Sequence, residues 1–174
     1  MKIILSAIVL FCTVSLLQAK DYRASLFGIE SNGITLNTTS IQKAIDYIQE
    51  NGGGRLVFYV GRYVTGSVYL KSNVTIHLEE GAILVGSLNP FDYERNDYWT
   101  ALIFAYDQQN IGITGKGVID GRGYQVAQNI LSMIHKGIIE DNDFRYDRPN
   151  AGLRPQNIYF KGCKNVLIQG IQIK

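Results

Sequence analysis

The chain has 174 residues, 46% of them hydrophobic, and its 17 basic and 15 acidic residues give a formal net charge of +2. This near-neutral balance, without a clustered basic excess, argues against a nucleic-acid-binding protein. The length suits one domain or part of one.

Residues 1–19 have the composition of a secretory signal peptide. Lys2 provides a positive start, Ile3–Leu17 form an apolar run, and the small Ala19 suits the last position before cleavage. The run is shorter than the roughly 20 apolar residues of a membrane span. We therefore expect a mature chain of residues 20–174 that is secreted or periplasmic and keeps no membrane anchor after cleavage.

Cleavage of the signal peptide decides which of the two cysteines remains in the mature chain. Cys12 could mark a lipoprotein, but the bulky Phe11 precedes it where a small residue is expected. Cleavage after Ala19 leaves only Cys163, so we expect no intramolecular disulfide. Cys163 is interpreted as a small buried residue near a turn.

One long amphipathic helix is predicted near the start of the mature chain. Thr39 and Gln42 have the spacing of a capping box, and Gly52–Gly54 supply the left-handed backbone that ends a helix. The apolar residues fall on one helical face. They are Ile41, Ala44, Ile45 and Ile48.

Ten short strands are predicted after this helix. They are rich in β-branched or aromatic residues and are separated by Gly, Asn, Asp or Lys-Ser-Asn turns. Strands this short do not suit an ordinary barrel. They are Leu56–Val60, Val68–Leu70, Val74–Leu78, Ile83–Val85, Leu102–Ala105, Ile111–Ile113, Val118–Ile119, Ile158–Phe160, Val166–Ile168 and Ile171–Ile173.

A local unit of asparagine, apolar, any and apolar residue recurs along these strands, which is typical of a solenoid. It begins at Asn73, Asn110, Asn157 and Asn165. Asparagine tolerates positive φ at a corner, and stacked corners could align into a ladder. We therefore predict an all-β, parallel β-helix with long inserts at Asn89–Thr100 and Tyr124–Arg154. The helix would cap its N-terminal end, and the open edge at Ile171–Ile173 suggests a chain truncated at the C-terminal end.

The string from Gly115 to Gly123, Gly-Lys-Gly-Val-Ile-Asp-Gly-Arg-Gly, resembles the mark of glycoside hydrolase family 28, the polygalacturonases and related pectin-degrading enzymes. Gly28–Asp46, Gly52–Ser87 and Arg154–Lys174 resemble the same family, so the likeness covers nearly all of residues 20–174. The resemblance implies a right-handed, pectin-lyase-like parallel β-helix and hydrolysis with inversion. It covers about the first third to half of such an enzyme.

The catalytic motifs of that family are not found in the sequence. Inversion needs two sets of carboxylates roughly 6.5–9.5 Å apart. The family supplies them in an Asn-Thr-Asp segment and an Asp-Asp pair, supported by Gly-His-Gly and Arg-Ile-Lys segments, and none of these occurs here. We expect them downstream of Lys174. We therefore assign no catalytic residue, metal or cofactor, leave substrate-binding residues unassigned, and expect this chain alone to be inactive.

Several acidic residues and one histidine are candidate site residues. Asp120 precedes a glycine and is predicted to have a structural role in a turn. Glu79 and Glu80 are adjacent, so on a strand they would face opposite ways, and we expect a solvated turn. His77 is out of phase with its apolar neighbours and is expected to point away from the core.

The insert Tyr124–Arg154 carries cationic and aromatic groups that could bind an acidic sugar, although an ordinary solvated loop is the commoner explanation for this composition. They are His135, Arg145, Tyr146, Arg148 and Arg154.

Asp141, Asp143 and Asp147 could hold calcium, but they lack the glycine and final glutamate of a calcium loop. Tyr63, Tyr69 and Tyr93–Trp99 could stack on a sugar ring, although packing within the coils is the commoner role.

Three functions remain open from the sequence. The chain is interpreted as the N-terminal part of a secreted polygalacturonase-type hydrolase whose partner is an acidic plant polysaccharide such as pectin. The alternatives are a non-catalytic carbohydrate-binding or structural module and a pectate lyase, and the Ile-Asp-Gly string disfavours the lyase. The open C-terminal edge would also allow self-association.

Overall fold

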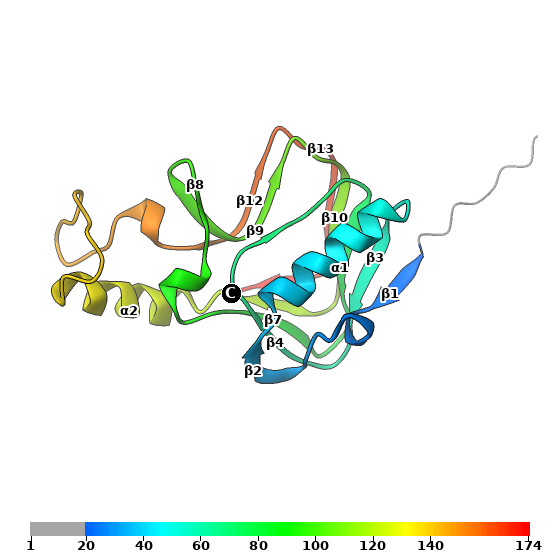
Figure 1. Ribbon diagram of the computed structural model, residues 1–174, viewed down its shortest axis with the longest axis horizontal. Coiled ribbons are helices and arrows are strands. Elements are labelled where there is room, and N and C mark those ends of the chain that lie inside the picture. The colour runs from blue at the N-terminus through cyan, green and yellow to red at the C-terminus, as the bar shows by residue number, and fades with distance from the viewer. Residues whose placement is uncertain (1–19) are drawn as a thin grey trace, which may run out of the picture.

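The computed structural model describes residues 20–174, so the predicted signal peptide of residues 1–19 lies outside the described part. The described chain winds into a parallel β-helix, in which successive coils contribute strands to three sheets (Figure 1). Neighbouring strands within each sheet are parallel. No helix among residues 20–174 is long and apolar enough to cross a membrane.

The three sheets are named A, B and C. Sheet A contains β1 (Asp21–Arg23), β3 (Gly54–Phe58), β6 (Val74–Leu78), β10 (Gln109–Gly115) and β13 (Lys164–Gln169). Sheet B contains β2 (Asn32–Leu36), β4 (Gly61–Thr65), β7 (Ala82–Gly86), β11 (Val118–Asp120) and β14 (Gln172–Ile173). Sheet C contains β5 (Val68–Tyr69), β9 (Trp99–Tyr106) and β12 (Gln156–Lys161), and the short β8 (Arg95–Asn96) pairs antiparallel with β9.

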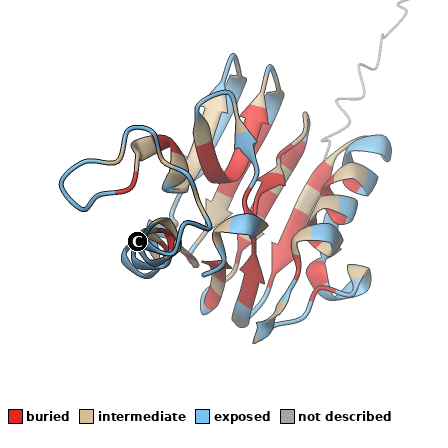
Figure 2. Ribbon diagram, turned by 60° about the vertical axis from the view of Figure 1, so that its left-hand side comes forward, coloured by how far each residue is buried: buried red, intermediate tan, exposed pale blue. Residues whose placement is uncertain are grey.

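The core forms because apolar side chains at equivalent positions of successive coils stack on one another. Leu56, Ile76 and Ile113 are in register across sheet A, and all three are fully buried. Each such burial is worth about 1.5–3 kcal/mol relative to exposure. Figure 2 shows buried residues running through the stacked strands, with exposed residues at the outer corners.

All ten predicted strands are present, with ends that differ by a few residues; Val74–Leu78 has the predicted bounds. The prediction lacks β1, β2, β4 and β8. Strand β2 does not follow the alternation of buried apolar residues that predicts a strand, because its central apolar residue, Ile34, is 85% exposed. The same alternation is missing from the start of β4, which opens with Gly61 and Arg62.

The predicted helix is α1 (Thr38–Glu50), which lies across one end of the stack and buries the four predicted apolar residues (Figures 1 and 2). The predicted capping box is wrong. The N-cap residue is Asn37, whose side chain bonds to backbone groups of residues 30 and 35. Gln42 instead accepts from the N–H of Tyr69 and donates to its C=O, at 2.7 and 3.1 Å, so its amide pairs with strand β5.

The predicted asparagine ladder is confirmed at three of its four positions. Asn73, Asn110 and Asn165 have φ values of 64°, 55° and 53°. The Asn110 amide donates to Asn73 Oδ1 at 2.9 Å, and the Asn165 amide donates to Asn110 Oδ1 at 3.0 Å. The prediction is wrong for Asn157, which lies within β12 and donates to the carbonyl of Lys174.

The first part of the insert Tyr124–Arg154 is helical, which corrects the prediction of a loop. Helix α2 (Gly123–His135) buries Val126 and Ile130, which are four residues apart and share one helical face. This helical spacing was visible in the sequence. Residues 20–174 also contain three short 3₁₀ helices: η1 (Ala24–Phe27), η2 (Pro90–Asp92) and η3 (Ala151–Leu153).

Candidate functional site

The two long connections of the fold lie at the same corner of the coil. One joins β7 to β9 and contains η2 and β8, and the other joins β11 to β12 and contains α2 and η3. Both leave sheet B and return to sheet C, so they project from one side of the stack (Figure 1). Insertions of a solenoid that gather on one face often form its binding surface. This corner is therefore the candidate functional site.

A cluster of aromatic side chains lies on the outer face of sheet C beside this corner. Val68 and Ile103 belong to the core, so their neighbours Tyr69 and Phe104 point to the opposite face of the sheet. Phe104 is stacked between two tyrosine rings, with centroid distances of 5.2 Å to Tyr69 and 5.7 Å to Tyr106. Tyr159 and Trp99 extend the cluster onto β12 and towards β8.

Two hydroxyl groups of this aromatic cluster are chemically perturbed. The Tyr69 hydroxyl donates to Glu94 Oε2 at 2.7 Å, and burial together with this carboxylate raises the pKa of Tyr69 to about 12. The Tyr106 hydroxyl is buried and has no hydrogen-bond partner among the described residues. Burial also raises the pKa of Tyr106. The single hydroxyl proton of Tyr69 is therefore committed to Glu94, whereas that of Tyr106 has no acceptor among the described residues.

The predicted sugar-stacking aromatics divide into two groups. Tyr63 is buried and packs edge-on against Phe58, and Tyr93 is buried and donates to the carbonyl of Ser87 at 2.7 Å, so both are packing residues. Burial raises the pKa of Tyr93. Tyr98, in contrast, is 41% exposed and has the guanidinium of Arg95 over its ring at 5.6 Å. An exposed aromatic face beside a cation suits a sugar ring that carries an acidic group.

The cationic residues of the second long connection do not form a closed site. Arg145 and Arg148 face each other across a tight turn, and both are exposed. Tyr146 at the tip of this turn is 94% exposed. His135 ends α2 and packs edge-on against the ring of Phe144 at 5.8 Å. Arg154, which was predicted to act with them, is also exposed. Binding of an acidic sugar by these residues stays a prediction.

Two of the three aspartates that could have held calcium, Asp141 and Asp143, bond to the same residue, Asn150. Asp141 accepts from the backbone N–H of Asn150 at 2.6 Å, and Asp143 accepts from its side-chain amide at 2.8 Å. Asp147 Oδ1 is 3.8 Å from Nε2 of His135, at the end of α2. Within residues 20–174 no group of three or more His, Cys, Asp or Glu side chains is arranged to hold a metal ion.

The remaining candidate residues lie where the sequence placed them. Asp120 ends β11, and its carboxylate accepts from the backbone N–H of Arg122 at 3.1 Å, which confirms its role in a turn. Glu80 is exposed in the turn after β6. His77 points away from the core, as predicted, since the residues on either side of it are fully buried. Cys163 lies in the turn between β12 and β13, as predicted, but it is half-buried rather than buried, with Sγ 3.5 Å from the carbonyl of Ala105.

Comparison with known proteins identifies relatives of this chain. No protein-family model matches. The sequence is 38% identical over 116 residues to an exo-poly-α-D-galacturonosidase of Dickeya chrysanthemi, an alignment that covers 57% of this chain and 19% of the relative. The chain spans between 19% and 38% of the length of the curated relatives that it matches.

Solved structures give the same result. A protein of Parabacteroides merdae with a provisional glycosyl hydrolase assignment is 49% identical, with a TM-score of 0.80 over 88% of this chain and 64% of that chain. The family 28 exopolygalacturonase of Yersinia enterocolitica is 27% identical, with a TM-score of 0.71 over 90% of this chain and 35% of that chain. These matches confirm the right-handed parallel β-helix. The chain is therefore related to the polygalacturonase-like proteins of glycoside hydrolase family 28 and corresponds to their N-terminal portion.

Proposed function

We propose that this chain supplies the N-terminal coils of a secreted, pectin-degrading glycoside hydrolase of the polygalacturonase type, which acts on polygalacturonan with inversion. The observation that carries the proposal is the match of nearly all described coils to a family 28 exopolygalacturonase. The aromatic cluster and Arg95 lie where the long connections project, and they suit contact with an acidic sugar chain.

The catalytic carboxylates of this proposal belong to coils that follow β14 in a longer chain. Inversion needs two carboxyl groups with room for a water between them. Among the described acids at the candidate corner, Asp120 and Asp141 bond to backbone N–H groups, and Glu94 accepts from Tyr69. These carboxylates hold the loops in place.

The C-terminal edge of the stack has the structure that a further coil requires. Strands β12, β13 and β14 are each paired on one side only. Apolar side chains of this last coil are partly open to solvent. They are Val166 (42% exposed), Ile168 (46%) and Ile173 (49%), and their counterparts in earlier coils are buried. An added coil would pair these strands and cover these side chains.

The test is an assay of reducing ends released from polygalacturonate, run on residues 20–174 and on any longer chain encoded beyond codon 174. We expect no release from residues 20–174 and release from a longer chain that adds the two carboxylate segments. Cleavage by residues 20–174 would contradict the assignment of catalysis to later coils. A stop codon directly after Lys174, together with polygalacturonate binding without cleavage, would instead establish the non-catalytic binding module.

Secretion is part of the same proposal and rests on residues 1–19. The intact mass of the product collected outside the cell membrane should correspond to a chain that starts at Lys20. A product that keeps Met1 in the cell would contradict it.

A further inference from the structure

A groove with a volume of about 630 Å³ lies on the outer face of sheet A, and it is not part of the corner with the long connections. Within each coil the chain passes from sheet C through sheet A to sheet B, so sheet A is separated from that corner by a sheet on either side. The groove crosses four neighbouring strands, with Arg55 on β3, His77 on β6, Thr114 on β10 and Gln169 on β13.

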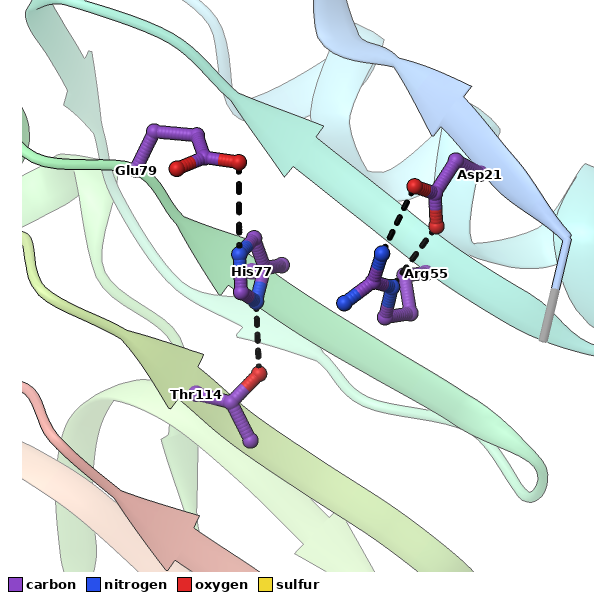
Figure 3. A network of polar contacts seen from close by, with 5 residues as sticks. All are labelled: Asp21, Arg55, His77, Glu79 and Thr114. Carbon is purple, nitrogen blue, oxygen red and sulfur yellow. Dashed lines mark hydrogen bonds and ion pairs between the residues drawn. The ribbon is translucent and has the colours of Figure 1, made fainter. Parts of the chain in front are cut away.

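The polar side chains at one end of this groove are already fixed by one another (Figure 3). Arg55 donates from Nε and Nη2 to the two carboxylate oxygens of Asp21, at 2.6 and 2.7 Å. His77 has Nδ1 2.8 Å from Thr114 Oγ1 and Nε2 3.5 Å from Glu79 Oε1, and its side chain is only 16% exposed. Groups held in this way lose little entropy when a ligand binds.

In this groove a hydroxyl, an imidazole and a carboxylate are in contact in that order, in Thr114, His77 and Glu79. The same order of groups occurs in hydrolytic sites. A hydrolytic site of that kind needs free backbone N–H groups to stabilise an oxyanion. The N–H groups of Lys116 and Gly117 both donate to the carbonyl of Leu78, at 2.9 and 3.0 Å. These donors are therefore occupied, and the arrangement favours binding over hydrolysis.

The groove offers both hydrogen-bond donors and acceptors beside an apolar side chain. Arg55 keeps one guanidinium nitrogen that Asp21 does not use, and Lys116 forms no ion pair with another described residue. Glu79 is about half exposed and Leu167 is 53% exposed, so carboxylate acceptors and an apolar side chain are both accessible. Ligand sites commonly combine an apolar wall with a few polar groups that fix orientation.

The charge of the groove selects against an acidic ligand. Two cations, Arg55 and Lys116, line the groove, and Arg55 is already paired with the carboxylate of Asp21, which lies outside the lining. The two carboxylates of the lining, Glu79 and Glu80, would repel a uronate group. The strands that the groove crosses are about 4.8 Å apart, so three steps span roughly 14 Å. This length accommodates a short oligosaccharide.

We propose that this groove is a second carbohydrate site, which takes uncharged sugar units. Glu79 and Glu80 would accept hydrogen bonds from sugar hydroxyls, Lys116 would donate to ring or hydroxyl oxygens, and Leu167 would pack against the C–H face of a ring. The choice of carbohydrate as ligand class rests on the proposed function, but the site is separate from catalysis.

The test is a titration of isotope-labelled residues 20–174 with galactotriose, followed by the amide resonances of Gly115 and Gly170. We expect both signals to shift and to saturate. Loss of a hydrogen bond to a charged group should make binding of the trisaccharide about tenfold weaker in Glu79→Gln. Lys116→Ala provides a second exposed variant, and Glu50→Gln on α1 is the matched control that should leave binding unchanged.

Two results would overturn the proposal. One is the absence of any saturating shift at these two amides. The other is tighter binding of trigalacturonate than of galactotriose in the groove, since the charge argument predicts the opposite order. Neither result bears on the release of reducing ends by a longer chain, so failure of this site and failure of the proposed function can be told apart.

Discussion

The asparagine ladder can be tested at its central member. Asn110 donates to Asn73, accepts from Asn165 and has a φ of 55°. Asn110→Ala removes both hydrogen bonds, worth about 0.5–1 kcal/mol each at an exposed position. It also places alanine in the left-handed region, at a cost of about 1–2 kcal/mol. We expect the free energy of unfolding to fall by about 2–4 kcal/mol, or Tm to fall by about 5–15 °C in a domain of this size.

A glycine variant separates the two contributions. Asn110→Gly removes the same hydrogen bonds, but glycine adopts a positive φ without steric cost. It should therefore be about 1 kcal/mol more stable than Asn110→Ala. Urea unfolding followed by circular dichroism measures both variants. Equal stability, or a more stable alanine variant, would refute the argument that the corner requires a left-handed residue.

Asn157 is the matched control for the ladder, since it shares the sequence template but not the structure. Its amide makes one hydrogen bond, and its Oδ1 is buried without a partner in the described chain. Asn157→Ala should cost no more than about 1 kcal/mol. An effect as large as that of Asn110→Ala would show that the template, rather than the ladder, determines stability.

Asp21→Asn should lower the free energy of unfolding at pH 7 by about 0.2–1 kcal/mol, because the ion pair with its arginine partner is partly exposed. The hydrogen bond from that arginine lowers the pKa of Asp21 below 3.8. The ion pair therefore stabilises the fold above pH 3.8, and this contribution is lost as the pH falls through the pKa of the folded state. Acid unfolding should show the difference in stability between variant and wild type disappear below that pKa. Burial is the larger cause of the raised pKa of Tyr69, and Glu94 adds to it, so Glu94→Gln should lower that pKa from about 12 but leave it above 10. The ring carbon resonance measures it, and an unchanged value would contradict the assigned hydrogen bond. Ile130→Ala should cost about 2–5 kcal/mol because this residue of α2 is fully buried, whereas the exposed Gln128→Ala should cost under about 0.5 kcal/mol; similar small losses would mean that α2 does not pack into the core.

Local patterns predicted the features that local physics controls. The spacing of Ile41, Ala44, Ile45 and Ile48 predicted which face of α1 is buried, and it is buried against the first coils. The tolerance of asparagine for positive φ predicted the ladder at Asn110 and its neighbours. The buried helix face and the asparagine corner each depend on one residue and its near neighbours along the chain, so a short sequence window is enough to predict them.

The errors arose where a distant segment competes for the same group. Gln42 fits a capping box, but the backbone of Tyr69, 27 residues away, offers its amide both a donor and an acceptor. Asn157 fits the corner template, but it lies in β12, where the strand continues and no turn requires positive φ. Neither competitor is visible within a sequence window.

The candidate site was predictable only in part. The sequence indicated two inserts and their aromatic and cationic residues. That both inserts leave sheet B and enter sheet C, and so share one corner, follows from the stacking of the coils. The groove on sheet A also depends on stacking, because His77 and Thr114 are 37 residues apart and become neighbours only through the register of β6 and β10.

By itself, the sequence of this protein determined the strand-rich repeat, the amphipathic helix, the asparagine corners and the likeness to pectin-degrading enzymes. The tertiary structure decided which asparagines join the ladder, which partner Gln42 takes, that α2 enters the core, and which side chains meet on each outer face. The physical reason is that φ preference and hydrophobic periodicity are properties of neighbouring residues. The contacts across a β-helix, in contrast, depend on the number of residues that each coil uses before it returns to the same sheet.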